Sequence, residues 1–146
     1  MPTTTQIQTQ TLKWLQAYHA SGDSMDPHTS VPKFYAEDCE MLFPGQPPIK
    51  GHAQIIAFFE RQFQILASMK HTIGHVDVAE DRVYQEADIE YVLKGDPEGQ
   101  VIKVQGMAVF GKGVHDERMR FFKVFLDPEA ILKRVGEVQG MGMGTE

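Results

Sequence analysis

The sequence predicts an α+β fold in which one mostly antiparallel sheet packs against a long helix. Three observations lead to this class: helical periodicity near the N-terminus, a long apolar helical stripe that begins at Gly51, and later strand-like segments joined by short turns. Short connections favour an antiparallel meander, because parallel neighbours need a crossover of about a dozen residues. A chain of 146 residues is long enough for one domain with its own core.

Two helical segments come first. Apolar and aromatic residues recur at helical spacing from Ile7 to Tyr18, and this helix is expected to end near Asp23. A shorter helix is expected over residues 28–35, where Pro32 falls in the first turns that tolerate proline. An acidic break at residues 37–38 is expected to separate this helix from the first strand.

A short strand and a loop lead into the long helix. Cys39, Met41 and Phe43 alternate along the strand and share one face. Residues 44–50 contain too much proline for a sheet ladder. The helix that begins at Gly51 carries a wide apolar stripe, which must pack on a large surface. The stripe comprises Ile55, Phe58, Phe59, Phe63 and Leu66.

Further strands, separated by turns rich in glycine, aspartate and proline, complete the expected sheet. They are expected over residues 71–78, 83–93, 101–110 and 119–126. A short terminal helix follows, because Asp127 before Pro128 has the form of a helix cap. Residues 136–146 lack a patterned apolar face, so we expect a single domain over 1–135 and a flexible tail.

Composition and charge exclude several classes of partner. The formal net charge of −6 argues against nucleic acids, whose phosphates bind lysine and arginine. No segment reaches the roughly 18 apolar residues of a membrane span. The N-terminus lacks the form of a signal peptide, so we expect a cytoplasmic protein without a membrane partner.

We also expect no cofactor and no metal. The chain has no glycine-rich loop of the kind that cradles phosphate, and a single cysteine excludes a cysteine-rich metal site. His71 and His75 are four residues apart, but on a strand this spacing separates them by about 13 Å. They therefore do not form a metal-binding pair.

Residues 34–51, followed by HAQIIAFFERQF, resemble the entry to the nuclear-transport-factor-2-like fold and, within it, the SnoaL-like proteins. KGDPEG at 94–99 and FLDPEAILKR at 125–134 resemble fungal members that accompany secondary-metabolite pathways. The resemblance implies a cone-shaped barrel, in which a curved sheet wraps around the long helix and the N-terminal helices close a pocket. One such scaffold hosts many unrelated sites, so the reaction must come from the residues.

The last expected strand is apolar on both faces, with Phe121 and Phe125 on one and Phe122 and Val124 on the other. A strand that is buried on both sides needs two covers. We expect a homodimer that pairs through the convex face of the sheet, as the resembled fold often does. The alternative is that the first helix or the tail covers this face within one chain.

Candidate catalytic residues follow from a second resemblance. MKHTIGH at 69–75 resembles the strand entry of scytalone dehydratases, whose catalytic histidine lies in a His-x-Ile-Gly pattern. Tyr18 and His19 stand where those enzymes have a tyrosine followed by an aspartate, both lining the pocket. The resemblance implies that His71, His19 and Tyr18 converge on one cavity. An imidazole moves protons near neutral pH, and a phenol donates a hydrogen bond to an oxygen.

Departures from the resembled enzymes narrow the reaction. Ala87 and Met41 replace the second histidine and another pocket tyrosine of scytalone dehydratases, so their dehydration is not implied. Limonene-epoxide hydrolases use an Asp-Arg-Asp set, and the corresponding positions here are Ala87, Ile89 and Val124. That hydrolytic set is therefore absent.

Alternating carboxylates offer a different hydrolytic site. An epoxide hydrolase with rearranged carboxylates would need Glu86, Asp88 or Glu90 inside the cavity. We expect these three on a solvated or dimer-rim face, because the residues between them, including Ala87 and Ile89, suit the core better.

An apolar cavity is expected between sheet and helices, rich in phenylalanine and methionine as adaptable sites are. Arg120 shares the strand parity of Phe122 and Val124, so it could hold an enolate or carboxylate at the cavity mouth; a surface cation is the favoured alternative. The alternative for the whole set is a filled core. The expected substrate-binding residues are Phe34, Met41, Phe43, Phe59, Phe63, Ile89, Tyr91, Val104, Arg120, Phe122 and Val124.

These residues favour a cofactor-independent enzyme that rearranges a small hydrophobic metabolite by proton transfer: a cyclase, isomerase or dehydratase acting on a polyketide or terpenoid-like skeleton. His71 would be the general acid/base, His19 its partner, and Tyr18 the donor to an oxygen that gains negative charge. The alternative is a dimer that binds a small molecule or acts as a scaffold without catalysis.

Overall fold

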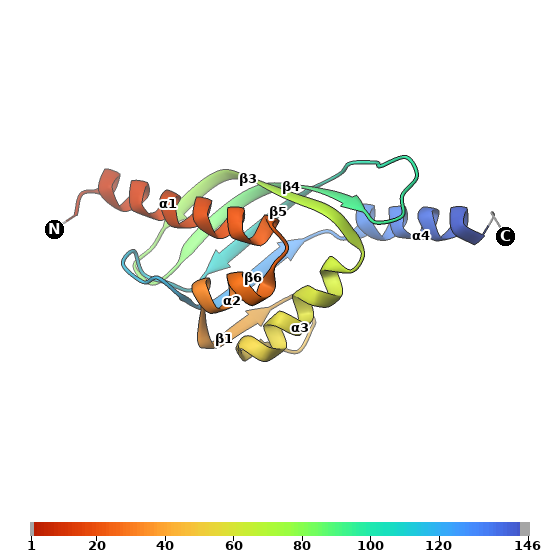
Figure 1. Ribbon diagram of the computed structural model, residues 1–146. Helices are drawn as coiled ribbons and strands as arrows, with labels where there is room; N and C mark the ends of the chain where they lie inside the picture. Colours follow the sequence, from red (N-terminus) through yellow and green to blue (C-terminus); the bar gives the residue numbers. More distant parts are fainter. Residues whose placement is uncertain (1, 144–146) are drawn as a thin grey trace.

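A curved six-stranded sheet, with three helices along its inner side, forms the body of the protein (Figure 1). The computed structural model describes residues 2–143. Its elements, in chain order, are α1 (Thr4–Asp23), α2 (Pro27–Phe34), β1 (Tyr35–Leu42), β2 (Ile49–Lys50), α3 (Gly51–Phe63), β3 (Leu66–Val78), β4 (Val83–Leu93), β5 (Ile102–Phe110), β6 (Met119–Leu126) and α4 (Glu129–Met143). The predicted α+β class is confirmed.

The strands lie in the order β2-β1-β6-β5-β4-β3. The last four strands of the chain form the expected antiparallel meander, and β1 joins β6 in parallel. Within the described residues β2 and β3 are the two edges, so the sheet curves as a cone wall without closing into a barrel. α1 runs along β3, while α2 and α3 lie beside β1 (Figure 1).

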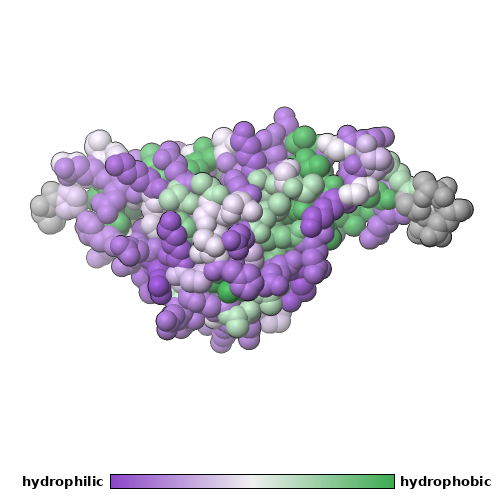
Figure 2. Space-filling view, viewed as in Figure 1, coloured by the Kyte–Doolittle hydropathy of each residue, from purple (hydrophilic) through white to green (hydrophobic). Residues whose placement is uncertain are grey.

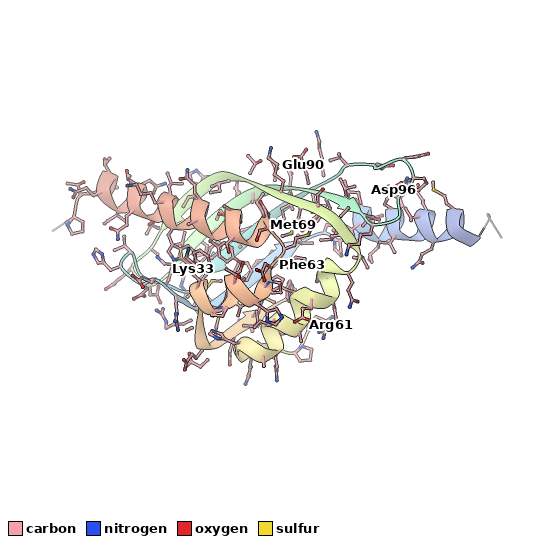
Figure 3. All side chains as sticks on the ribbon, in the orientation of Figure 1. Lys33, Arg61, Phe63, Met69, Glu90 and Asp96 are labelled. Carbon is pink, nitrogen blue, oxygen red and sulfur yellow. The ribbon has the colours of Figure 1, made fainter. Side chains whose placement is uncertain are left out.

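The two sides of the sheet differ sharply in burial. Along β4, Gln85 and Ile89 are buried beneath the helices, whereas Tyr84, Glu86 and Asp88 are exposed. We call the side that carries Gln85 and Ile89 the inner face and the opposite side the outer face. Figure 3 shows Glu90 on the side of the sheet away from α2 and α3. The expectation that the alternating carboxylates face solvent is confirmed.

An aromatic core fills the inner face where α1 crosses the sheet. The ring of Tyr18 stacks on Trp14 at a centroid distance of 5.4 Å and meets Phe34 and Phe110 edge-on at 5.6 and 5.3 Å. Phe122 lies 5.0 Å from Phe110 and completes the group. Offset and edge-on contacts of this kind add to the stability that burial of the rings already supplies.

α4 covers the opposite end of the inner face. Ile131, Val135 and Val138 pack against a second apolar cluster, which comprises Leu66, Leu93, Ile102 and Val104. The guanidinium of Arg134 donates to both carboxylate oxygens of Asp96, at 2.9 and 2.7 Å, and so ties the helix to the β4–β5 loop. The helix continues to Met143, into the segment that we expected to be a flexible tail. The flexibility of this segment stays a prediction, and residues 144–146 lie outside the described residues.

The outer face carries exposed apolar residues. Tyr84, Met107 and Phe125 are 38%, 41% and 46% exposed. Met107 and Phe125 line a hollow of about 490 Å³ together with Glu86 and Asp88. The buried residues of α1 and the apolar stripe of α4 pack on the inner face, so within the described residues neither helix covers this side. The homodimer stays a prediction.

Three strand boundaries differ from the prediction. β1 begins at Tyr35, so the acidic pair at 37–38 lies inside the strand, near an irregularity in its pairing with β6. Ile49 pairs with Met41 despite the prolines before it. β3 begins at Leu66, which therefore belongs to the sheet and not to the stripe of α3.

No helix in residues 2–143 is both long and apolar enough to cross a membrane.

Candidate active site

Two histidines from distant parts of the chain stack on the inner face. His19 lies in the last turns of α1 and His71 in β3. Their rings are 4.6 Å apart between centroids and only 21° from parallel. The contact follows from the packing of α1 along β3, which brings the buried side of the helix against the inward-facing residues of the strand. The structure thus brings together two of the three predicted catalytic residues.

Asp23 fixes the orientation of His71. One carboxylate oxygen of Asp23 lies 2.6 Å from Nδ1 of His71, and the other accepts the backbone N–H of His71 at 2.9 Å. A carboxylate only accepts, so Nδ1 carries the proton and Nε2 is left for other chemistry. Within the described residues Nε2 has no hydrogen-bond partner, and the side chain of His71 is 17% exposed. The imidazole is therefore held by one nitrogen and available at the other.

His19 differs from His71 in charge. Burial, and to a lesser extent the neighbouring His71, lowers the pKa of His19 to about 4. Its Nε2 lies 2.8 Å from Oε1 of Gln85, which accepts the ring N–H. His19 is thus a neutral ring at physiological pH.

Tyr18 points elsewhere. Its hydroxyl lies 2.6 Å from the hydroxyl of Tyr35, inside the aromatic core, and burial raises the pKa of both phenols well above the ordinary value. The ring touches His19 edge-on, at a centroid distance of 5.1 Å. The phenol is therefore a buried core group, and the predicted role of holding a substrate oxygen does not fit this position.

Most of the predicted lining residues are core residues. Phe34, Met41 and Phe122 are buried in the main core, and Phe43, Phe59 and Val124 pack against it. Ile89 and Val104 are also buried in the inner face. Their burial favours the filled core, which is the alternative that the sequence left open, and the lining of an apolar cavity by these residues stays a prediction.

Arg120 lies outside the core. Its guanidinium donates to the Asp116 carboxylate at 3.3 Å and to the Asp81 carbonyl oxygen at 3.2 Å, and its side chain is half exposed. These surface contacts favour the alternative of a surface cation over a place at a cavity mouth.

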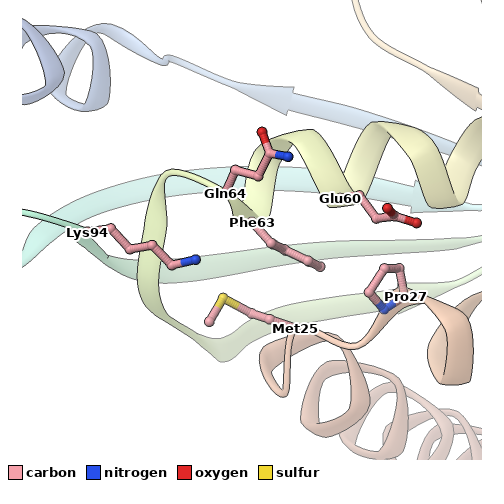
Figure 4. A pocket seen from close by; sticks show the side chains of 6 residues that line it. All are labelled: Met25, Pro27, Glu60, Phe63, Gln64 and Lys94. Atoms are coloured by element: carbon pink, nitrogen blue, oxygen red, sulfur yellow. The ribbon is translucent and has the colours of Figure 1, made fainter.

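A shallow cavity of about 270 Å³, wide open to solvent, lies at the end of the inner face near α4. Met25, Pro27 and Phe63 form its apolar wall, with Lys94 on one side and Glu60 on the other (Figure 4). The lining is completed by Gln64. Of the predicted lining residues, Phe63 is the one that borders this cavity. Figure 2 shows apolar residues reaching the surface between the C-terminal ends of α1 and α3.

The cavity and the histidine pair are neighbours in the chain and in the packing. Met25 follows Asp23 by two residues, and Met69 precedes His71 by two residues on the same face of β3. Met25, Phe63 and Met69 pack against one apolar cluster, and Figure 3 shows Phe63 and Met69 at the same side of the molecule. The histidine pair and the cavity therefore border the same part of the inner face.

Sequence reasoning missed the polar partners of the candidate site. Asp23 had the appearance of a helix-end residue, although it lies one turn after His19 on α1 and therefore on the same side of the helix. Gln85 occupies one of the alternate positions of β4 that are otherwise apolar and face the core. A polar residue at such a position was the one signal in the sequence, because a buried polar side chain needs a partner. In residues 2–143 no group of three or more histidine, cysteine, aspartate or glutamate side chains is placed to hold a metal ion.

Solved structures with the same fold include proteins from bacteria and fungi. One from Jannaschia sp. CCS1, named as a SnoaL-like polyketide cyclase, has a TM-score of 0.70 at 19% identity, over 85% of this chain and 90% of that one. PrhC from Penicillium brasilianum has a TM-score of 0.77 at 11% identity, over 93% and 92%. SalBIII, named as an epoxide hydrolase/cyclase-like enzyme in pyran ring formation, has a TM-score of 0.67 at 18% identity, over 82% and 92%.

At these identities the likeness shows the fold alone. A search of curated proteins found no match. The model of the SnoaL-like domain family matches residues 14–120, which contain His19, Asp23, His71 and Gln85. Because this match spans most of the chain, the protein belongs to the SnoaL-like family.

Proposed function

We propose that the protein is a cofactor-independent enzyme that moves a proton on a small apolar molecule, with His71 as the general acid/base. The observation that carries the proposal is the Asp23–His71 pair, with its 2.6 Å contact at Nδ1 and its open Nε2. A base held by a carboxylate on one nitrogen and exposed on the other is the arrangement that proton transfer requires. The structural neighbours named as a polyketide cyclase and an epoxide hydrolase/cyclase-like enzyme support this class of chemistry.

The proposed step is removal of a proton from a carbon next to a carbonyl group. Nε2 of neutral His71 takes the proton, the electron pair of the C–H bond moves into the enolate, and Asp23 stabilises the imidazolium. The same Nε2–H then returns the proton, either to another carbon or to a departing hydroxyl. Isomerisation and dehydration differ only in that second step, and an enolate that attacks a second carbonyl gives cyclisation.

His19 is a positioning residue in this scheme. Its ring supports one face of His71, and its neutrality avoids a second positive charge against the imidazolium. The hydrogen bond to Gln85 fixes the ring, so the stack presents His71 in one orientation.

Exchange of carbon-bound hydrogen tests the proposal without knowledge of the natural substrate. A panel of enolisable bicyclic ketones, beginning with 2-tetralone, is incubated in D2O, and deuterium uptake next to the carbonyl is followed by NMR. His71→Asn should lower the protein-dependent rate at least about a hundredfold. The matched control is His75→Asn, on the same strand but with an exposed side chain, and it should exchange like the wild type.

Two results would contradict the proposal: a His71→Asn rate equal to that of the wild type, or no exchange above the buffer rate with any ketone. Circular dichroism of each variant establishes that the fold is retained.

A binding protein without catalysis is the second candidate. The packed aromatic core favours it, because the cavity of about 270 Å³ beside the histidine pair lies open at the surface. Ketones that bind equally well to the wild type and to His71→Asn, and return unexchanged, would support this candidate. The epoxide hydrolase reading loses its basis, since Glu86, Asp88 and Glu90 lie on the outer face.

A further inference from the structure

We propose that Tyr91 is a further catalytic residue, whose phenol donates a hydrogen bond to the substrate oxygen that gains negative charge while His71 removes the proton. The inference rests on the proposed function, which so far has no hydrogen-bond donor for the substrate oxygen. It also names the substrate class: an apolar molecule whose reacting carbon stands next to a carbonyl group.

The register of β3 and β4 places Tyr91 beside His71. His71 pairs with Ile89, and Met69 pairs with Tyr91. Residues i and i+2 of a strand share a face, so Tyr91 follows Ile89 on the inner face, one step nearer to the cavity. Diagonal neighbours of this kind have backbone positions roughly 7–8 Å apart, within reach of aromatic side chains. A carbonyl oxygen and the proton on its neighbouring carbon fit between a phenol and an imidazole at that separation.

Tyr91 lies among the residues that lead to the cavity. Its side chain packs against the same apolar cluster as Met25 and Phe63, both of which line the cavity. It is half-buried, and its hydroxyl, which makes no hydrogen bond within the described residues, is accessible to solvent. A phenol that no protein group occupies, between the base and the cavity, is free to donate to a ligand oxygen.

The charge state of Tyr91 also suits a donor. Burial raises the pKa of Tyr91 to about 12, and the negative charge of Asp23 raises it as well. The phenol therefore keeps its proton at neutral pH. It stabilises an enolate oxygen by hydrogen bonding, without transferring the proton, as a preorganised oxyanion donor does.

Tyr91 differs from the other phenols of the chain in the place of its hydroxyl group. The hydroxyls of Tyr18 and Tyr35 bond to each other in the aromatic core. Tyr84 lies on the outer face of the same strand and is 38% exposed. Tyr84 is therefore a matched control, since Tyr84→Phe removes the same oxygen atom from β4 on the opposite side of the sheet.

Binding of 2-naphthols measures the donor directly. Substituted 2-naphthols of graded acidity mimic an enolate, and their fluorescence separates the neutral from the ionised form. We expect the wild type to bind the naphtholates more tightly than naphthalene, and Tyr91→Phe to weaken naphtholate binding roughly ten- to a hundredfold while naphthalene binding is unchanged. Tyr84→Phe should bind like the wild type.

The ketone exchange assay gives the matching kinetic result. Tyr91→Phe should slow exchange roughly a hundred- to a thousandfold, the usual loss when one oxyanion donor is removed. If Tyr91→Phe exchanges and binds like the wild type while His71→Asn is inactive, the inference is wrong and the proposed function stands. If His71→Asn exchanges like the wild type, the proposed function itself is wrong. A wild type that shows no preference for naphtholate over naphthalene also overturns the inference.

Discussion

On the inner face of β4, Gln85 and Tyr91 lie among the side chains of α1, β3 and the cavity, whereas Glu86 and Asp88 on the outer face lie in solvent. The two faces alternate residue by residue along one strand. The outer face has the larger number of carboxylates, yet one inward carboxylate, Asp23, organises a histidine pair. The comparison teaches that enclosure, and not the number of charged groups, distinguishes a candidate site from a solvated surface.

The sharpest test of this comparison removes one carboxylate from each face. Asp23→Asn should lower the ketone exchange rate roughly a hundred- to ten-thousandfold, because an amide can donate to Nδ1 and favour the wrong tautomer of His71. Asp88→Asn on the outer face should leave the rate unchanged. Equal rates for the two variants, measured by the same NMR assay, would remove the distinction between the faces.

The pH dependence of stability tests the enclosure of His19. Below its ordinary pKa of 6.5 the unfolded chain binds a proton at His19, whereas the folded chain binds it only near pH 4. Stability that is present above pH 6.5 is therefore lost as the pH falls from 6.5 to 4, by about 3 kcal/mol. Urea unfolding at pH 7 and pH 4 should show this loss in the wild type and in His28→Gln, which changes an exposed histidine.

The variant His19→Gln should lack that part of the pH dependence. The carboxylates of the chain titrate in the same range in all three proteins, so the difference between them isolates His19. An identical pH slope in His19→Gln would mean that His19 is accessible to protons in the folded state.

The oligomeric state of the protein tests whether the outer face of the sheet is a dimer interface. The predicted homodimer would bury Phe125 and Met107, so Phe125→Glu should weaken dimerisation roughly ten- to a hundredfold through the loss of apolar contact and the burial of a charge. Sedimentation velocity over a concentration series measures this. Leu132→Glu is the control, since Leu132 is 64% exposed on α4, away from that face. A wild type that sediments as a monomer at high concentration would refute the predicted dimer.

Patterns within single elements predicted most of the fold. The bounds of β4 and β6 agree with the prediction, and the meander follows from the short turns between strands. The extent of α4 was missed, although Ile131, Val135 and Val138 recur at helical spacing along it. The glycines at 136 and 140 concealed this stripe, because glycine lowers the helix propensity of a segment whose packing nevertheless stabilises it.

The candidate site was predicted only in part. His19 and His71 were found because imidazoles are rare and chemically distinctive residues. Asp23 was not, since its role depends on a contact across 48 positions of sequence that no local pattern encodes. The position of the cavity was also beyond the pattern, because whether Phe34 and Phe122 line a space or fill it depends on how their volumes meet across three helices and a sheet.

His19 and Asp23 lie one turn apart on α1, and each holds His71 in a different way. The spacing of one helical turn therefore places both the stacking ring of His19 and the carboxylate of Asp23 against His71 at the same time. A single residue inserted between them would turn one through about 100° relative to the other, so that both could not engage His71 together. Any shift of α1 away from β3 would release both contacts at once, which makes the readiness of the base an all-or-none property of how this helix is docked.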